Sequence, residues 1–215
     1  MPALLLGSIG VLAETSDLQR EAFNAAFAGA GLDWHWARED YAAMLALSGG
    51  RDRIARYAER TGAEIDADAL HARKGVLFRE RLSRGVAPRP GVVETIGAAR
   101  EAGWRVGFVT STSRENVEAT LAATGIDPQR FDLVLCADDV ERGKPDPEVY
   151  RLALARLGMA PGDAVAVEDN PGGLAAAEGA AIACVAFPGA FHDRERFAAA
   201  SEIVDRLSLP VIPAM

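Results

Sequence analysis

The sequence predicts an α/β protein with a doubly wound parallel sheet and an inserted all-α domain. Two observations predict this fold. Short, continuous apolar runs alternate with amphipathic helical patterns, and one interval between the runs is far too long for a single crossover. The apolar runs, each expected to form a buried strand, are Ala3–Leu6, Val106–Val109, Leu133–Cys136, Ala164–Val167 and Ile182–Ala186.

Helical patterns follow the later runs at Val117–Thr124, Glu148–Leu157 and Gly173–Glu178. A buried strand, a helix and another buried strand form the repeating unit of a parallel sheet that helices cover on both faces. We therefore expect the strands to lie side by side in the middle of the main domain.

The long interval separates the run that ends at Leu6 from the run that starts at Val106. It carries helical patterns, broken by glycines, over 18–30, 38–47, 51–61 and 68–82, and a further helix over 92–102 leads back to the next strand. Pro88-Arg89-Pro90-Gly91 is a stiff turn suited to a hinge. We expect a core of residues 1–14 and 88–215 and a helical cap of residues 15–87.

Composition and charge exclude several classes of function. The chain has 215 residues and a net charge of −8, which argues against non-specific binding to nucleic acid or to an anionic membrane. No apolar run approaches the ~20 residues that span a bilayer, so we expect a cytoplasmic protein. Cys136 and Cys184 each lie in an apolar run and are expected to be buried, reduced thiols.

Polar residues follow three of the predicted strands, at the sheet edge where ligands of open parallel sheets bind. Thr110–Ser113 follow the second strand, with Asn116 in the next helix; Lys144 follows the third, and Glu168 and Asp169 the fourth. Hydroxyls at a helix N-terminus and a lysine suit phosphate, and carboxylates suit Mg²⁺. The pattern predicts a site for phosphate and a divalent cation.

Each of these groups also has a purely structural interpretation. The hydroxyls of Thr110–Ser113 are suited to cap the following helix, Lys144 to a surface loop, and the acidic pair Glu168-Asp169 to a helix dipole. Their occurrence at three consecutive strand ends, in order, favours a common site. Asp138 and Asp139 lie near the same edge and are weaker candidates.

The same segments are similar to motifs of the haloacid dehalogenase superfamily, in the branch with a helical cap after the first strand. The similar core segments are Val109-Thr110, Gly143–Pro147 and Val167–Leu174. The cap segments Leu12–Thr15, Gly49–Arg56 and Arg89–Gly91 resemble CbbY-type sugar-phosphate phosphatases. The resemblance covers nearly the whole chain. It implies a Rossmann-like core and a Mg²⁺-dependent phosphatase for a small phosphorylated metabolite.

The resemblance also implies roles for individual residues. Thr110 would hold the transferring phosphoryl group, with Ser111 and Asn116 at its edge, and Lys144 would neutralise it. Asp169, helped by Glu168, would hold Mg²⁺. The cap residues that would contact the distal part of a sugar phosphate are Arg51, Arg53 and Lys74.

The first motif departs from the family pattern. Where the family has Asp-x-Asp-Gly-Thr-Leu, this chain has Gly7-Ser8-Ile9-Gly10-Val11-Leu12 without a gap. Gly7 thus stands at the position of the nucleophilic aspartate and Ile9 at that of the acid/base. Neither can attack phosphorus or transfer a proton, and Mg²⁺ loses a ligand. We expect impaired catalysis and weak Mg²⁺ binding or none.

Other residues offer poor replacements. Alternation along the first strand predicts that Ser8 points away from the face of Gly7 and Ile9, and no histidine lies in a matching loop. The glycine spacing that a dinucleotide-binding loop requires is absent from this chain. Two hypotheses remain: a pseudoenzyme that binds a phosphorylated metabolite, with a protein partner if it is regulatory, or a Mg²⁺-dependent hydrolase of non-standard chemistry.

Overall fold

A parallel sheet of six strands, in the order β3-β2-β1-β4-β5-β6, forms the centre of the computed structural model, which describes residues 1–45 and 49–209. The strands are β1 Ala3–Leu6, β2 Arg105–Val109, β3 Leu133–Leu135, β4 Ala164–Glu168, β5 Ala183–Ala186 and β6 Glu202–Ile203. The five predicted strands are confirmed to within one residue at each end. β6 was not predicted, because two residues, one of them exposed, make no apolar run.

The central strand β1 pairs with β2 on one side and β4 on the other. Leu6 is in register with Phe108 of β2 and with Val167 of β4. All four side chains of β1 are fully buried, which explains its uninterrupted apolar run. This register brings the residues that follow β1, β2 and β4 to one edge of the sheet.

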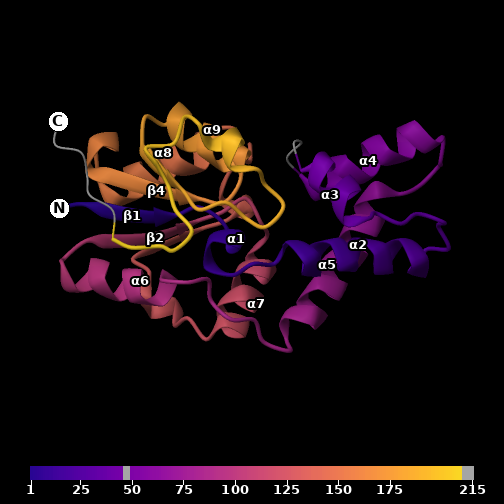
Figure 1. Ribbon diagram of the computed structural model, residues 1–215, viewed down its shortest axis with the longest axis horizontal. Helices are drawn as coiled ribbons and strands as arrows, with labels where there is room; N and C mark the ends of the chain where they lie inside the picture. The colour runs from indigo at the N-terminus through magenta and orange to yellow at the C-terminus, as the bar shows by residue number, and fades with distance from the viewer. Residues whose placement is uncertain (46–48, 210–215) are drawn as a thin grey trace.

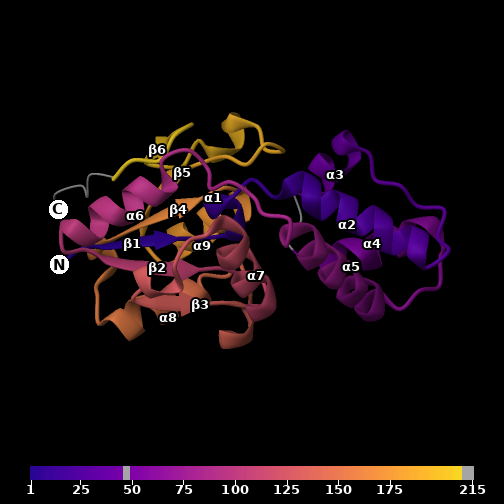
Figure 2. The same ribbon diagram turned by 90° about the horizontal axis from the view of Figure 1, so that it is seen from below.

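Helices cover both faces of the sheet, which confirms the doubly wound prediction (Figures 1 and 2). On one face α6 (Val92–Glu101) and α7 (Arg114–Thr124) pack in a cluster with Leu4 and Leu6. On the other, α8 (Glu148–Leu157) and α9 (Pro171–Gly179) pack in a cluster with Leu5. Alternate residues of β1 thus serve opposite faces, as the strand period requires.

Four of the helices that the structure describes between β1 and α6 form the predicted cap, which lies to one side of the sheet (Figure 1). They are α2 Ser16–Gly29, α3 Arg38–Met44, α4 Gly50–Thr61 and α5 Ala67–Leu82. The helix expected to end at Leu47 ends at Met44, and residues 46–48 lie outside the described residues. An apolar cluster around Phe23, Phe27 and Trp36 fills the cap, and Phe191 of the core is also part of it. Residues 15 and 87 as domain boundaries stay a prediction.

Arg89, in the predicted hinge, joins the cap connection to the core. Its Nη1 donates to the carbonyl oxygens of Gly10 (3.0 Å) and Phe187 (2.7 Å), and its Nη2 to that of Pro188 (2.7 Å). The guanidinium also lies 3.4 Å from the centre of the Phe187 ring. The turn is therefore anchored by one side chain to two separate parts of the core.

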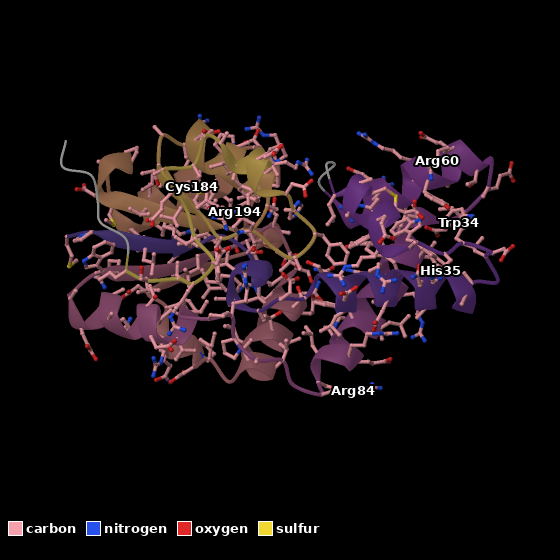
Figure 3. The ribbon with its side chains drawn as sticks, in the orientation of Figure 1. Trp34, His35, Arg60, Arg84, Cys184 and Arg194 are labelled. Atoms are coloured by element: carbon pink, nitrogen blue, oxygen red, sulfur yellow. The ribbon has the colours of Figure 1, made fainter. Side chains whose placement is uncertain are left out.

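Two further sequence predictions are tested by burial and length. Cys136 and Cys184 are both free and buried, as expected; Figure 3 shows Cys184 inside the α/β core. Among the helices in the described part of the chain, none combines the length and the apolar character needed to cross a membrane.

Candidate functional site

The edge formed by the ends of β1, β2 and β4 collects the predicted core residues. The residue after β1, Gly7, donates its backbone N–H to Val167 of β4 (2.9 Å), and Thr110 after β2 donates to Leu135 of β3 (2.9 Å). The side chain of Lys144 reaches the same edge, where its Nζ donates to the carbonyl oxygens of Gly7 (2.5 Å) and Val109 (2.7 Å). The predicted convergence of Thr110, Lys144 and Glu168 thus rests on the parallel register.

Lys144 is a buried residue here, not a surface loop lysine. Besides the two carbonyls, its Nζ contacts Glu168 Oε1 at 2.6 Å and the Tyr150 hydroxyl at 3.3 Å. Its side chain is 6% exposed and that of Glu168 is 0% exposed. The ammonium group has three protons and four acceptors around it, so its hydrogen-bonding capacity is filled from within the protein.

Glu168 is turned into the core at the end of β4. Its Oε1 accepts hydrogen bonds from Lys144 and from the Tyr150 hydroxyl (2.6 Å), while its buried Oε2 has no hydrogen-bond partner. Burial raises the pKa of the Glu168 carboxyl; the Lys144 charge opposes this rise, and the Asp169 carboxylate adds to it. A fully buried carboxylate with two donors on one oxygen is a structural counter-ion, unavailable to an approaching ligand.

Asp169 lies beside Glu168 but faces a different set of groups. Its Oδ1 accepts from the Ser8 hydroxyl (2.6 Å) and from the side-chain amide of Asn170 (2.8 Å). The expectation that Ser8 points away from the site was therefore wrong. β1 ends at Leu6, so strand alternation no longer applies at Ser8, which instead caps the short helix α1 (Ile9–Leu12) through a bond from Val11 N (3.1 Å).

The carboxylates at this edge do not fit a magnesium ion in the arrangement that the structure shows, although the family is typically Mg²⁺-dependent. Gly7 supplies no carboxylate, Glu168 is directed at Lys144 and Tyr150, and Asp169 Oδ1 accepts from Ser8. Across residues 1–45 and 49–209, no group of three or more His, Cys, Asp or Glu side chains is arranged to hold a metal. Mg²⁺ requires several oxygen ligands at short distance, and this edge has one carboxylate in position.

The hydroxyl-rich loop after β2 is internally bonded. Thr110 Oγ1 accepts from Thr112 N (3.3 Å), and Ser111 Oγ accepts from Lys144 N (3.0 Å). Asn116, in the first turn of α7, donates to Thr112 Oγ1 (3.0 Å) and accepts from Arg79 of α5 (3.2 Å). The loop therefore lies at the N-terminus of α7, where backbone N–H groups favour anions, and Asn116 connects it to the cap.

The weaker candidates, Asp138 and Asp139, have structural partners. Asp138 accepts from Arg114 N (2.9 Å), and Asp139 pairs with the Arg114 guanidinium (2.8 Å). Both also accept from the Cys136 thiol. Their carboxylates fasten the start of α7 to the end of β3.

Two of the three predicted cap residues lie together in its interior. Arg53 and Lys74 are 7% and 4% exposed, and both lie over the ring of Phe23, at 6.0 and 4.7 Å from its centre. Burial lowers the pKa of Lys74 to about 7, and the neighbouring positive charges of Arg53 and Arg79 add to this. Arg51 instead is exposed and pairs with Asp68 (2.9 Å).

Sequence reasoning missed Tyr150 and Arg79. Tyr150 is fully buried in the apolar face of α8. A tyrosine among apolar residues usually has a hydrogen-bond partner for its hydroxyl, and this was the signal available in the sequence. Arg79 gave no signal, because an arginine on a helix is ordinarily a solvated residue. Its contact with Asn116 depends on how α5 meets α7.

Comparisons with known proteins agree with this fold. A family model described as haloacid dehalogenase-like hydrolase matches residues 9–181. Protein CbbY of Cereibacter sphaeroides is 41% identical over 209 residues, covering 94% of this chain and 91% of the relative. Protein CbbY of Rhodobacter capsulatus is 37% identical, covering 100% and 97%.

Solved structures give the same result. The crystal structure of CbbY from Rhodobacter sphaeroides in complex with phosphate has a TM-score of 0.89 and 40% identity, covering 96% of this chain and 95% of that one. A mutant of that protein in complex with xylulose-(1,5)bisphosphate has the same TM-score and coverage. The chain therefore belongs to the haloacid dehalogenase-like hydrolase family, as a CbbY-like member.

Proposed function

We propose that this chain binds a small sugar phosphate between its helical cap and the strand ends of its core, and that its phosphatase chemistry is impaired. The observation that carries the proposal is the contrast between the cap and the end of β1 in the core. The cap keeps a buried cationic pair, Arg53 and Lys74, while the end of β1 has glycine and isoleucine at positions 7 and 9. Such a protein acts by binding, as a sensor or a regulator of a protein partner.

The impairment follows from the end of β1. Gly7 has no side chain to attack phosphorus, and Ile9 is 6% exposed within the apolar cluster that α6 and α7 share with the sheet. An isoleucine held in an apolar cluster can neither protonate a leaving oxygen nor activate water. Losing a nucleophile of this kind costs on the order of a million-fold in turnover.

Binding is proposed to depend first on the cap. The Lys74 ammonium donates to the neutral side-chain oxygen of Gln19 and lies between the rings of Phe23 and Phe78, at 4.7 and 5.0 Å from their centres. A cation in such a setting gains more from a bound phosphate than a solvated one does, because water screens the pair less. Arg53 adds a second charge. Arg51, paired with Asp68 on the surface, is a weaker candidate.

The other end of the ligand is proposed to lie against the loop after β2, where Thr110, Ser111 and Asn116 precede or begin α7. Support comes from the helix N-terminus and from the two related crystal structures, which hold phosphate and xylulose-(1,5)bisphosphate. Lys144 and Glu168 are proposed to neutralise each other at this end, and Asp169 is the carboxylate that stays outside this pair.

The test is a paired measurement of binding and turnover on purified protein. Calorimetric titration with xylulose 1,5-bisphosphate should give saturable binding, which Lys74→Met weakens about ten-fold or more and Arg73→Met, on the exposed neighbouring position of α5, leaves unchanged. Phosphate release with Mg²⁺ should be barely above the buffer rate. Turnover within about a hundred-fold of ordinary enzymes would contradict the impairment.

A second candidate function rests on the Ser8–Asp169 pair. A hydroxyl that donates to a carboxylate at 2.6 Å has the arrangement of a nucleophile and its base. Ser8 Oγ would attack phosphorus as its proton passes to Asp169, and the bond from phosphorus to the sugar oxygen would break as Asp169 returns that proton to the oxygen. Water would then hydrolyse the phosphoserine, which releases phosphate and restores Ser8. Turnover that Ser8→Ala abolishes and Ser111→Ala preserves would favour this hydrolase. Turnover that neither variant changes would exclude Ser8.

A further inference from the structure

Two glycines from distant parts of the chain make room for the Glu168 carboxylate. A Cβ atom at Gly7 would lie 2.1 Å from Glu168 Oε1 and 2.3 Å from its Cδ. A Cβ atom at Gly173, in the first turn of α9, would lie 2.0 Å from Glu168 Oε2 and 2.1 Å from Cδ. Neither glycine has a positive φ, so the backbone at both positions suits any residue. At Gly173 the atoms that exclude a side chain belong to Glu168, and at Gly7 they belong to Glu168 and to the Tyr150 hydroxyl.

The carboxylate in this slot neutralises a lysine that has no other buried anion at hydrogen-bond distance among the contacts of the described residues. Lys144 Nζ has two backbone carbonyls, the Tyr150 hydroxyl and Glu168 Oε1 around it. A buried ammonium without a counter-ion is costly, because its hydration is lost and nothing replaces it.

We propose that Glu168, seated between Gly7 and Gly173, has become the permanent internal counter-ion of Lys144, in place of the carboxylate and the metal ion that the strand end lacks. The buried charges of Lys144 and Glu168 therefore balance each other within the protein. The stability of this part of the fold needs no Mg²⁺. The proposal rests on the proposed function only in treating this edge as the former reaction end of the site.

The same geometry excludes Glu168 as a substitute nucleophile. Its side chain is 0% exposed, and both oxygens are enclosed, one by Lys144 and Tyr150 and the other against Gly173. A carboxylate that attacks phosphorus has to reach the ligand. Glu168 thus supplies charge balance and not chemistry.

The decisive experiment is a double-mutant cycle between Gly173 and Glu168, measured by thermal and urea unfolding. An alanine in place of glycine normally stabilises a helix, so a loss at position 173 reports the clash. Gly173→Ala should lower the melting temperature by about 5 °C or more in the wild-type background. In the Glu168→Ala background the same change should cost nothing or stabilise, because the three nearest atoms to the new methyl group all belong to Glu168.

Two controls accompany the cycle. Gly97→Ala, inside α6, places its Cβ 4.0 Å from the nearest atom and should be neutral or stabilising in both backgrounds. Gly7→Ala should also be relieved by Glu168→Ala, but only in part, because the Tyr150 hydroxyl lies 2.4 Å from its Cβ as well. If a glycine-to-alanine variant folds only when Glu168 is also replaced by alanine, the two positions count as energetically coupled.

A third measurement concerns the metal. Millimolar MgCl₂ should leave the melting temperature of the wild-type protein unchanged, because an ion that does not bind the folded state adds no stability. A rise that disappears in Glu168→Gln would identify Glu168 as a metal ligand and overturn the proposal. Equal losses from Gly173→Ala in both backgrounds would overturn it too. None of these results depends on sugar-phosphate binding or turnover, so the proposed function can fail independently.

Discussion

Lys144 Nζ and Glu168 Oε1 lie 2.6 Å apart with both side chains buried, at the end of the central strands. The pair links several elements. Lys144 also donates to the carbonyl oxygens of Gly7, just after β1, and of Val109 in β2, and the Tyr150 hydroxyl of α8 donates to the same Glu168 oxygen. A buried ion pair is valuable less for its own strength than for the cost of breaking it.

Glu168→Gln should therefore destabilise the fold markedly. The substitution keeps the shape of the side chain but leaves the Lys144 charge buried without a counter-ion, which costs about 3–5 kcal/mol. Urea unfolding measures the loss. Glu178→Gln, exposed near the end of α9, should change the unfolding free energy by less than about 0.5 kcal/mol. The double variant Glu168→Gln/Lys144→Met should recover much of the loss; no recovery would mean that Lys144 is not the partner that matters.

Lys74→Met should stabilise the protein in a pH-dependent way. The folded pKa of Lys74 is about 7, against a usual value of 10.5. Below pH 7 both the folded and the unfolded chain hold the proton, and the full cost of the buried charge, on the order of 4 kcal/mol, is present. Between pH 7 and 10.5 only the unfolded chain holds it, so the cost fades as pH rises.

The gain from Lys74→Met should consequently be larger at pH 6 than at pH 9.5, measured as the difference in melting temperature from wild type. The lost contacts with Phe23 and Phe78 offset part of it. Arg73→Met serves as the matched control and should show no such trend. A gain that is equal at both pH values would contradict the lowered pKa.

Arg89→Ala should weaken the junction of cap and core. It removes three hydrogen bonds to backbone carbonyls and a stacked ring contact, and should cost about 2–4 kcal/mol. Arg89→Lys should recover little, because an ammonium lacks the planar fork that reaches both Phe187 and Pro188. Arg84→Ala, exposed at the end of α5 (Figure 3), is the control. Unfolding curves of all three variants decide the matter.

Ile9→Asp should be destabilising by about 3 kcal/mol or more at neutral pH, because it buries a carboxylate in the apolar cluster around α1. Ile9→Val, which keeps the apolar contact, should cost about 1 kcal/mol. A triple variant with aspartates at positions 7 and 9 and threonine at 11 is expected to recover activity only if the Glu168 side chain moves out of the space that Gly7 leaves for it. A fully stable, fully active triple variant would show that the strand end has not been remodelled.

The sequence by itself determined the strands, most helices and the long insertion, because the period of apolar residues is a local property of the chain. β1 was placed correctly from Ala3–Leu6 and α8 from Glu148–Leu157. The ends of the parallel strands then dictated that Thr110, Lys144 and Glu168 converge, which needs only the topology. The family resemblance suggested Arg51, Arg53 and Lys74 as contacts of a sugar phosphate. The structure places Arg53 and Lys74 over the Phe23 ring, and their role in binding stays a prediction.

Only the tertiary structure decided which way each side chain turns at that edge. Gly7 follows β1, and Tyr150, Glu168 and Gly173 lie in α8, β4 and α9, so no single local pattern relates the four. The carboxylate of Glu168 faces Lys144 because two missing Cβ atoms leave space on both sides of it. Ser8 meets Asp169 because β1 stops two residues earlier. Periodicity determines which face of an element is buried, but the direction of a charged side chain depends on the volume and the counter-charges that distant residues provide.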